Sequence, residues 1–348
     1  MAPVKNGRIL FASHPDEYPI PGKDIIYDES ESIDLENVPL NGGFLIKALV
    51  LSIDPYMRGK MRKVADVGPS YEIGKPLDND GVALVLRSDH PDVKVGDHIF
   101  ARIPFQHYTI LQRLKGENFA RDGIILANKE NLPWSAYCGV AGIPGQTAYC
   151  AWKEYANPLK GEVAFVSAAA GSVGSFAVQL AKADGLKVIA CAGSDEKVDF
   201  VKSLGVDYAF NYKKEDTAKV LEKEGPVDIY WDNVGGPTLD AALANAASGA
   251  RFIECGMISG YNVQGGDAIR NLSRVVWSEI KLYGFLVGRL LPKYADAFYM
   301  EVPGLVREGK LKYLEDRTQG LEYAGRAIEA VQRGINKGKS VVIVAEEF

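Results

Sequence analysis

The chain has few of the residues that build metal centres and disulfide frameworks. Its 348 residues include four histidines and four cysteines, and the cysteines stand at wide, irregular intervals: Cys138, Cys150, Cys191 and Cys255. Such spacing favours free, buried thiols in a reducing compartment over disulfide pairs. A cytoplasmic location is therefore predicted.

Long apolar runs are missing as well. No run of apolar residues reaches the length of about 18 that indicates a membrane span. The first 20 residues mix charged side chains with three prolines, so they hold no continuous apolar core of a secretory signal. The formal net charge is −5 and the isoelectric point is about 5.6, whereas binding a phosphate backbone calls for a basic face. The sequence predicts neither a membrane nor a nucleic acid as partner.

Residues for hydrolytic and zinc chemistry are also absent from the sequence. There is no Gly-x-Ser-x-Gly elbow and no Walker lysine. Zinc alcohol dehydrogenases need a cysteine and a His-Glu pair, but the comparable stretch here, residues 79–83, reads Asn-Asp-Gly-Val-Ala. His98 and His107 are spaced to meet across a hairpin, although a surface or internally satisfied histidine is the alternative. No metal is predicted, so any substrate must be polarised by hydrogen-bond donors, of which the 17 tyrosines are examples.

The length and the local patterns predict two domains. Residues 1–138 contain β-branched runs between turns, at 44–53, 81–86 and 95–101, without a long helical period. From residue 162 onward strands alternate with helices, which is typical of a parallel sheet covered on both faces. The strands are expected at 162–167, 187–192, 208–211, 227–232, 251–255 and 281–287, and the first two helices at 172–184 and 195–204.

After about residue 310 this alternation stops. A helix is expected at 321–333 and a buried strand at 340–345. Because a lone terminal strand needs a sheet to join, we expect it to return to the first domain. The predicted fold class is α/β, with a Rossmann-type doubly wound parallel sheet at 139–310. A discontinuous β-rich substrate domain comprises residues 1–138 and 311–348.

The strongest motif follows the first strand of the alternating region. Residues 168–174 read Ala-Ala-Ala-Gly-Ser-Val-Gly, a variant of the dinucleotide fingerprint with alanine in the first glycine position. Small residues let the backbone approach a pyrophosphate, whose charge is favoured by the N–H groups of a helix start. Gly and Ala also pack helices on sheets, but the strand-turn-helix setting favours dinucleotide binding.

The end of the second strand indicates which dinucleotide. NAD enzymes usually place Asp or Glu there for the adenosine ribose. Here the strand ends in Cys-Ala-Gly-Ser at 191–194, without an acid, and Lys197 follows one helical turn later. This favours NADPH, whose 2′-phosphate an acid would repel. The alternative is that Lys197 is a solvated helix lysine, which the adjacent Asp195 and Glu196 leave open.

Eight segments then occur in the order found in one known family. They include Asp-Pro-Tyr-Met-Arg-Gly at 54–59, Asp-Asn-Val-Gly-Gly at 232–236 and Cys-Gly-Met-Ile-Ser-Gly-Tyr-Asn at 255–262; the others are 142–149, 168–174, 193–198, 210–213 and 336–339. Over nearly its whole length the chain resembles the zinc-independent medium-chain dehydrogenase/reductases of the prostaglandin/leukotriene reductase and plant alkenal double-bond reductase group. The resemblance implies that the β-rich domain is GroES-like.

The resemblance also implies roles for individual residues. Lys197 and Tyr212 would hold the adenosine 2′-phosphate, and Tyr261 and Tyr56 would lie near the substrate, with Tyr261 facing its carbonyl. The pyrophosphate would be cradled by Gly171, Ser172, Val173 and Gly174. The rest of the cofactor would be lined by Asn233, Cys255, Gly256, Met257, Ile258, Ser259, Tyr261, Phe285, Leu286, Val287 and Asn336.

Two departures from the family pattern concern the substrate side. Gly260 stands where many relatives carry a larger residue such as threonine. The glycine would loosen the loop that presents Tyr261. Residues 264–267 read Gln-Gly-Gly-Asp in place of a proline-rich stretch. The identity of the substrate is therefore the least transferable part of the resemblance.

The activity that the resemblance implies is NADPH-dependent reduction of the carbon-carbon double bond of α,β-unsaturated aldehydes and ketones. Hydride would reach the β-carbon, and the Tyr261 hydroxyl would stabilise the resulting enolate. The alternatives are a loop tyrosine that only packs on the cofactor, a quinone reductase on the same fold, and a non-catalytic NADPH-binding protein. A homodimer is expected from pairing of the strand at 281–287 with its copy.

Overall fold

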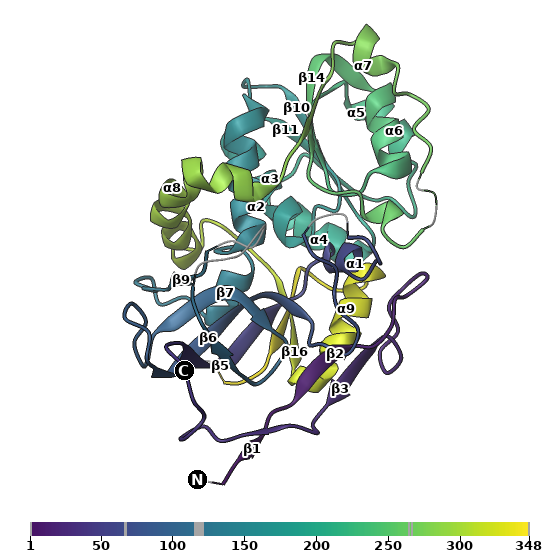
Figure 1. Cartoon of the computed structure of the whole chain (residues 1–348). Helices are drawn as coiled ribbons and strands as arrows, with labels where there is room; N and C mark the ends of the chain where they lie inside the picture. The colour runs from purple at the N-terminus through teal and green to yellow at the C-terminus, as the bar shows by residue number, and fades with distance from the viewer. Residues whose placement is uncertain (1, 66–67, 115–121, 264, 266, 347–348) are drawn as a thin grey trace. The chain divides into compact units, whose positions relative to one another are not determined.

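The computed structural model describes residues 2–65, 68–114, 122–263, 265 and 267–346. The chain forms two compact units, one of residues 1–139 with 315–348 and the other of residues 140–314. We call the first the β unit and the second the α/β unit, and Figure 1 labels their elements.

The β unit is built on one large, mainly antiparallel sheet. Its strands follow the order β16-β17-β5-β6-β7-β9, and β8 also pairs with β5. The two longest strands, β5 (Phe44–Ser52) and β6 (Asp78–Ser88), pair antiparallel and are largely buried because they are rich in aliphatic residues. The others are β7 (His98–Pro104), β8 (Tyr108–Leu111), β9 (Ile124–Ile125), β16 (Glu315–Gln319) and β17 (Lys339–Ile343).

The C-terminal strand confirms the expected return to this sheet. β17 pairs antiparallel with β5, with Val342 opposite Leu51. Before it come a 3-10 turn (Leu321–Tyr323) and helix α9 (Ala324–Gln332), which buries Ile328 in the core of the unit. The sequence did not predict β16, because its Glu-Asp-Arg-Thr-Gln run has no apolar alternation; it forms the edge of the sheet.

Short elements complete the β unit. There are two short antiparallel strand pairs: β1 (Val4–Lys5) with β4 (Ser32–Ile33), and β2 (Arg8–Phe11) with β3 (Ile25–Asp28). The unit also contains helix α1 (Met57–Lys60) and a 3-10 helix (Trp134–Cys138).

The α/β unit contains a six-stranded sheet in which every neighbouring pair is parallel. The order is β12-β11-β10-β13-β14-β15. This is the Rossmann order, with its switch point between β10 and β13. It confirms the predicted fold class. The bounds are β10 (Val163–Val166), β11 (Lys187–Ala192), β12 (Tyr208–Asn211), β13 (Val227–Asp232), β14 (Ala246–Glu254) and β15 (Lys281–Gly284).

Helices connect these strands, and side chains cap two of them. Ser194 accepts a hydrogen bond from the Lys197 N–H at the start of α4, and Asp216 caps α5. The bounds are α2 (Ile143–Ala151) with a π turn (Trp152–Ala156), α3 (Ser172–Ala183), α4 (Asp195–Ser203), α5 (Thr217–Glu224), α6 (Gly236–Ala244), a 3-10 turn (Ile258–Gly260), α7 (Arg274–Trp277) and α8 (Val287–Arg307).

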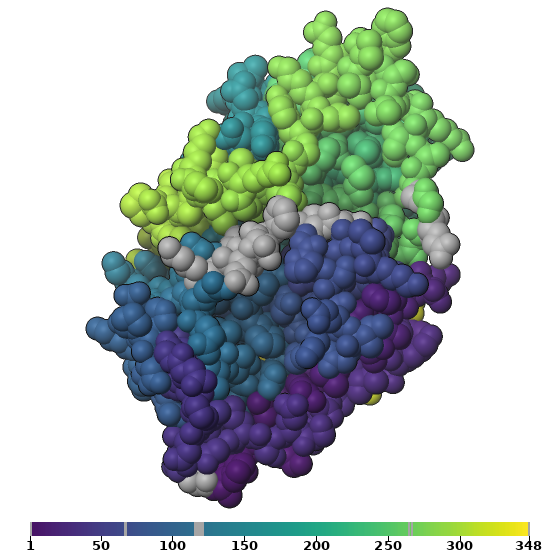
Figure 2. All heavy atoms as spheres, in the orientation of Figure 1, coloured from purple at the N-terminus to yellow at the C-terminus, as the bar shows by residue number. Residues whose placement is uncertain are grey.

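The sixth strand is shorter than the sequence predicted. β15 ends at Gly284, and Val287 begins α8 instead of closing a strand. The Phe-Leu-Val run favours a strand, and two prolines inside α8 argue against a long helix. Tertiary packing overrides both signals, because the fully buried Phe298 of α8 lies 5.6 Å from the Tyr149 ring of α2. The outer face of α8 forms part of the surface in Figure 2, where it is yellow-green.

Candidate functional site

The residues that the sequence singled out in the α/β unit all follow the carboxyl ends of its parallel strands. In spatial order these positions are Tyr212 after β12, Gly193 to Lys197 after β11, Gly171 to Gly174 after β10, Asn233 after β13, Cys255 to Tyr261 after β14 and Phe285 to Val287 after β15. In an open parallel sheet this edge, at the switch point, is where ligands bind. The fold therefore brings one group of predicted residues to one edge.

The turn between β10 and α3 has the backbone of a phosphate cradle. Ala168 adopts a left-handed conformation (φ 47°), and its carbonyl accepts a hydrogen bond from the Gly171 N–H at 3.0 Å. A Cβ on Gly174 would lie 2.5 Å from the Ala168 carbonyl oxygen, so only glycine lets α3 approach the turn this closely. The first turn of α3 has no side-chain cap and no acidic residue. These features fit an anionic group at the helix start.

At the next strand end, Tyr212 lies over Gly193. A Cβ on Gly193 would come within 3.1 Å of the Tyr212 hydroxyl oxygen, and burial raises the pKa of that phenol. Asp195 accepts hydrogen bonds from Asn211 and Lys214, and these bonds lower the pKa of its carboxyl group. Lys214 thus offsets the charge of Asp195, one of the two acids that precede Lys197, so a phosphate beside Tyr212 meets less repulsion than the sequence suggested.

Asn233 occupies the switch point and joins the two central strands. Its side-chain amide donates to the Ser167 carbonyl at 2.7 Å, and its backbone N–H donates to the Ser167 hydroxyl at 2.9 Å. Its side-chain oxygen accepts from the Trp231 indole at 3.1 Å. The side chain of Asn233 therefore holds β10 and β13 together at the predicted cofactor edge.

The loop after β14, residues 255–261, runs along the turn after β13. The N–H groups of Cys255 and Gly256 donate to the Asp232 carbonyl at 2.9 and 3.1 Å, and the Ser259 N–H donates to the Val234 carbonyl at 3.1 Å. A Cβ on Gly235 would lie 2.8 Å from Met257, so glycine permits this close approach. We call residues 255–261 the cofactor loop, after the role that the resemblance implies.

Tyr261 follows the 3-10 turn that ends the cofactor loop. A Cβ on Gly256 would lie 3.2 Å from the Tyr261 hydroxyl, so the phenol folds back towards the start of the loop. Gly260 has open space where a Cβ would stand and no positive φ, so a larger residue would fit there. Asp267 accepts a hydrogen bond from Ser259 at 2.8 Å, whereas Gln264 and Gly266 of the unusual stretch lie outside the described residues.

The last predicted segment of this unit has a packing role. The Phe285 ring lies 6.2 Å from that of Trp231 and 6.0 Å from that of Tyr155. Leu286 is 43% exposed and Val287 is the first residue of α8. These residues belong to a strand-to-helix loop rather than to the strand in which the sequence placed them.

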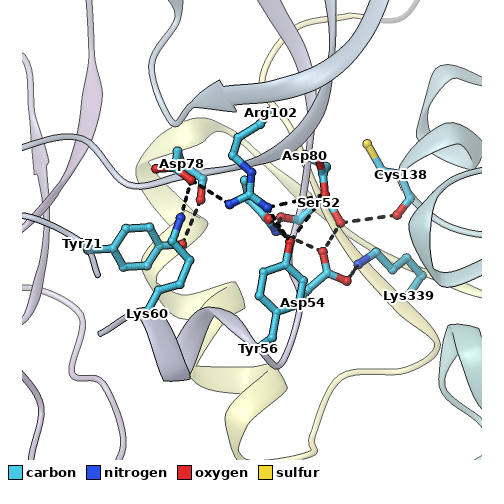
Figure 3. Close-up of polar contacts among 11 residues, drawn as sticks. Ser52, Asp54, Tyr56, Lys60, Tyr71, Asp78, Asp80, Arg102, Cys138 and Lys339 are labelled. Carbon is cyan, nitrogen blue, oxygen red and sulfur yellow. Dashed lines mark hydrogen bonds and ion pairs between the residues drawn. The ribbon is translucent and has the colours of Figure 1, made fainter. Parts of the chain in front are cut away.

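Tyr56 and Asn336 belong to the β unit. The Asn336 amide donates to the Gly338 carbonyl at 2.8 Å in the turn before β17. Tyr56 precedes α1, and its side chain is 37% exposed. Its hydroxyl donates to the Asn79 side-chain oxygen and accepts from Arg102 at 3.2 Å (Figure 3). The phenol is thus oriented from two neighbouring strands.

A network of buried and partly buried charged side chains lies next to the Tyr56 hydroxyl. The Asn79 amide nitrogen donates to Asp54 at 3.0 Å, and Asp54 forms a buried ion pair with Lys339 at 2.6 Å. On the other side Arg102 pairs with Asp78 at 3.1 Å (Figure 3). Asp78 also pairs with the buried Lys60, whose pKa is lowered chiefly by burial.

Sequence reasoning missed this network. Residues 79–83 stand out in the sequence only for the zinc ligands that they lack, and Asp78 precedes that stretch. The available signal was a run of three polar residues directly before the strand-forming Gly-Val-Ala-Leu-Val segment; in β6 these three residues are partly or fully buried. Buried polar residues need partners.

Two further observations apply to the described residues alone. No three His, Cys, Asp or Glu side chains among them gather into a group able to hold a metal ion. None of the helices in the described ranges has the length and apolar character of a membrane span.

Comparison with known proteins places this arrangement in a family. Residues 172–301 match a family model described as zinc-binding dehydrogenase, and residues 8–118 match one described as the N-terminal domain of oxidoreductase. The chain is 38% identical over 336 residues to the NADP(+)-dependent 2-alkenal reductase of Nicotiana tabacum, covering 92% of the chain and 95% of the relative. It is also 38% identical over 315 residues to the (+)-pulegone reductase of Mentha piperita, covering 88% and 89%.

A solved structure agrees with these relatives. The crystal structure of CurA from Vibrio vulnificus in complex with NADPH superposes with a TM-score of 0.87 at 32% identity, covering 98% of this chain and 99% of that one. The chain therefore belongs to the medium-chain dehydrogenase/reductase family, in the group that contains the alkenal and enone double-bond reductases.

Proposed function

We propose that the protein uses NADPH to reduce the carbon-carbon double bond of α,β-unsaturated aldehydes and ketones. The observation that carries the proposal is the set of strand ends of the Rossmann sheet, where a glycine-dependent turn, an uncapped helix start and Tyr212 beside Gly193 fit an NADP-type dinucleotide. The names of the tobacco and mint relatives support the reaction class.

The residues of the α/β unit have distinct parts in holding the cofactor. The N–H groups at the start of α3 take the pyrophosphate, and Gly174 keeps the turn close enough for them to do so. Lys197 and Tyr212 take the 2′-phosphate. The cofactor loop lines the nicotinamide end together with Phe285. Asn336 belongs to the β unit, and its assigned contact with the cofactor rests on the resemblance alone.

The bound cofactor supplies a hydride, which forms a new C–H bond at the β-carbon of the substrate. The double-bond electrons then move towards the carbonyl oxygen, and a proton from a hydroxyl or from water completes the α-carbon. The Tyr261 hydroxyl donates a hydrogen bond to the oxygen that gains negative charge. The reaction requires no metal ion in this proposal, and metal analysis showing one zinc per chain would overturn that part.

A homodimer fits the exposed edge of the parallel sheet. β15 is the edge strand, and its residues are mostly exposed, with Leu282 at 40%. An unpaired edge invites pairing with a copy across a two-fold axis. Sedimentation that shows only monomer at micromolar concentration would remove this part of the proposal.

The experiment that tests the function compares electron acceptors, with NADPH as the cofactor throughout. We expect consumption of NADPH, read at 340 nm, to be faster with 2-alkenals and enones than with quinones. Faster turnover of quinones would favour the rival quinone reductase. Tight NADPH binding without turnover on any acceptor would favour a non-catalytic binding protein.

Lys197→Ala tests the cofactor preference. It should raise the KM for NADPH at least tenfold and leave that for NADH within about threefold, because only NADPH carries the 2′-phosphate. Lys202→Ala on the same helix is the matched control, since Lys202 pairs with Asp199 and has no assigned role. Equal effects of Lys197→Ala on both cofactors would contradict the assignment.

A further inference from the structure

Two carboxyl groups meet at the carboxyl ends of β13 and β14. Asp232 and Glu254 are the last residues of these neighbouring parallel strands and are directly in register. Asp232 is fully buried. No local pattern predicts this pair, because the register between strands that are joined through a helix is not a local property.

Within the described residues, hydrogen bonds reach only one of the two carboxyl oxygens of Asp232. Its Oδ1 accepts from the N–H groups of Val234 and Gly235 at 2.7 and 2.8 Å and from the Tyr230 hydroxyl at 2.7 Å. Among the described residues its Oδ2 is buried and has no hydrogen-bond partner, and the same holds for both carboxyl oxygens of Glu254. Acceptor oxygens gathered in this way require a donor.

One proton satisfies this cluster. A neutral carboxyl group has one O–H donor, whereas two adjacent buried carboxylates repel each other and lose hydration. Because Oδ1 of Asp232 already accepts several donors, Asp232 is better suited to be the ionised partner and Glu254 to be the neutral one. Burial, followed by the charge of Asp232, raises the pKa of Glu254 to about 8; burial also raises the pKa of Asp232.

We propose that Glu254 is a neutral acid whose proton is donated to Oδ2 of Asp232, and that this proton positions the cofactor loop. The inference rests on the proposed function, in which that loop lines bound NADPH. Glu254 is a positioning residue here, since it acts through Asp232.

The link from this proton to the loop is a short series of backbone hydrogen bonds. The Asp232 carbonyl accepts from Cys255 and Gly256, which begin the loop, and the turn held by Asp232 Oδ1 provides the Val234 carbonyl for Ser259. Loss of the proton places two negative charges where both segments begin. The turn and the loop must then separate or admit water, which weakens NADPH binding.

The other titratable groups near the pair remain neutral across the relevant pH range. Tyr230 of β13 contacts Asp232, and burial raises the pKa of its phenol far above the ordinary value. Burial raises the pKa of Cys255, which follows β14, and of Cys191 in β11 to about 12 each. A transition near pH 8 is therefore assigned to Glu254.

The test measures the Kd for NADPH by nucleotide fluorescence from pH 6.5 to 9.5. The wild-type Kd should rise about tenfold across pH 8. Glu254→Gln keeps a donor towards Asp232 Oδ2 but has no proton to lose, so its Kd should stay within about twofold. Glu254→Leu, which has no donor, should bind weakly at every pH. Glu222→Gln, a change of an exposed glutamate on α5, is the control and should keep the wild-type profile.

A second readout needs no cofactor. Because the pKa of Glu254 is raised on folding, its proton favours the folded state most below the unfolded pKa of about 4.3, and this contribution is lost as pH rises towards 8. Relative to Glu254→Gln, the wild-type unfolding constant should increase up to about tenfold per pH unit in that window and then level off.

The two readouts separate the possible failures. If Glu254→Gln still loses affinity for NADPH at alkaline pH, the inference is wrong. It is also wrong if the stabilities of the wild type and of Glu254→Gln depend on pH in the same way. Failure to bind NADPH at any pH, with diverging stability curves, would instead refute the proposed function and leave the shared proton in place.

Discussion

At the residue scale, the two candidate substrate tyrosines have different surroundings. The Tyr56 hydroxyl is held by Asn79 and Arg102, in front of the buried Asp54–Lys339 pair. Tyr261 belongs to the cofactor loop, and its hydroxyl lies near Gly256. Loss of the hydroxyl group should therefore have different effects at Tyr56, whose phenol is held in place, and at Tyr261, whose phenol belongs to a loop.

Tyr261→Phe should act on catalysis. If its hydroxyl stabilises the enolate oxygen, kcat should fall about 10²–10³-fold, the usual effect of removing one such donor. The Kd for NADPH should change less than threefold. An unchanged kcat with the best enone would leave Tyr261 as a residue that only packs on the cofactor.

Tyr56→Phe should also cost stability. The Asn79 oxygen is fully buried and would lose its donor, which typically costs about 1–3 kcal/mol in unfolding free energy. Chemical denaturation of the apoprotein measures this loss. Tyr108→Phe in the same unit is the control, because the Tyr108 hydroxyl makes no hydrogen bond within the described residues. Equal unfolding free energies of Tyr56→Phe and Tyr108→Phe would contradict a stabilising hydrogen bond between Tyr56 and Asn79.

At the element scale, the turn between β10 and α3 makes the sharpest structural prediction. In Gly174→Ala the new Cβ would stand 2.5 Å from the Ala168 carbonyl oxygen and 2.9 Å from the Ala169 Cα, both backbone atoms. Such overpacking should destabilise the apoprotein by about 1–3 kcal/mol and weaken NADPH binding. In Gly171→Ala the nearest atom is 3.3 Å away, so the stability loss should be smaller. Equal losses of unfolding free energy in Gly174→Ala and Gly171→Ala would contradict the close approach of α3 to the turn.

The sequence predicted elements well where the signal is local. β11 and β12 have the predicted bounds, because each is a short run of strand-forming residues next to a turn. The Ala168 to Gly174 turn was also readable, since small residues and a following helix are adjacent in the chain. Phe285 to Val287 were misplaced because the packing of α8 on α2, which decides their conformation, is not local.

The candidate site divides in the same way. Each predicted cofactor residue of the α/β unit follows a strand, so its place at the sheet edge comes from topology. The partners of Tyr56 lie on β6 and β7, and those of Glu254 on β13, which depends on register between strands. Local patterns indicate that a buried polar residue needs a partner, but they do not identify it.

At the scale of the whole molecule, the chain combines a Rossmann α/β unit with a β unit that carries Tyr56 and Asn336. In the proposed reaction the hydride goes to the β-carbon of the substrate. A reductase of the double bond leaves the carbonyl group intact, whereas a carbonyl reductase of similar fold would produce an allylic alcohol.

The most direct measurement uses NADPH carrying deuterium at C4 of the nicotinamide, prepared separately with the label on each face. The enzyme reduces a simple enone, and the product is examined by NMR and mass spectrometry. We predict a saturated ketone with one deuterium on the β-carbon from only one of the two labelled cofactors, and an α-hydrogen that becomes deuterium in D₂O. An alcohol with the label on the former carbonyl carbon would contradict reduction of the double bond.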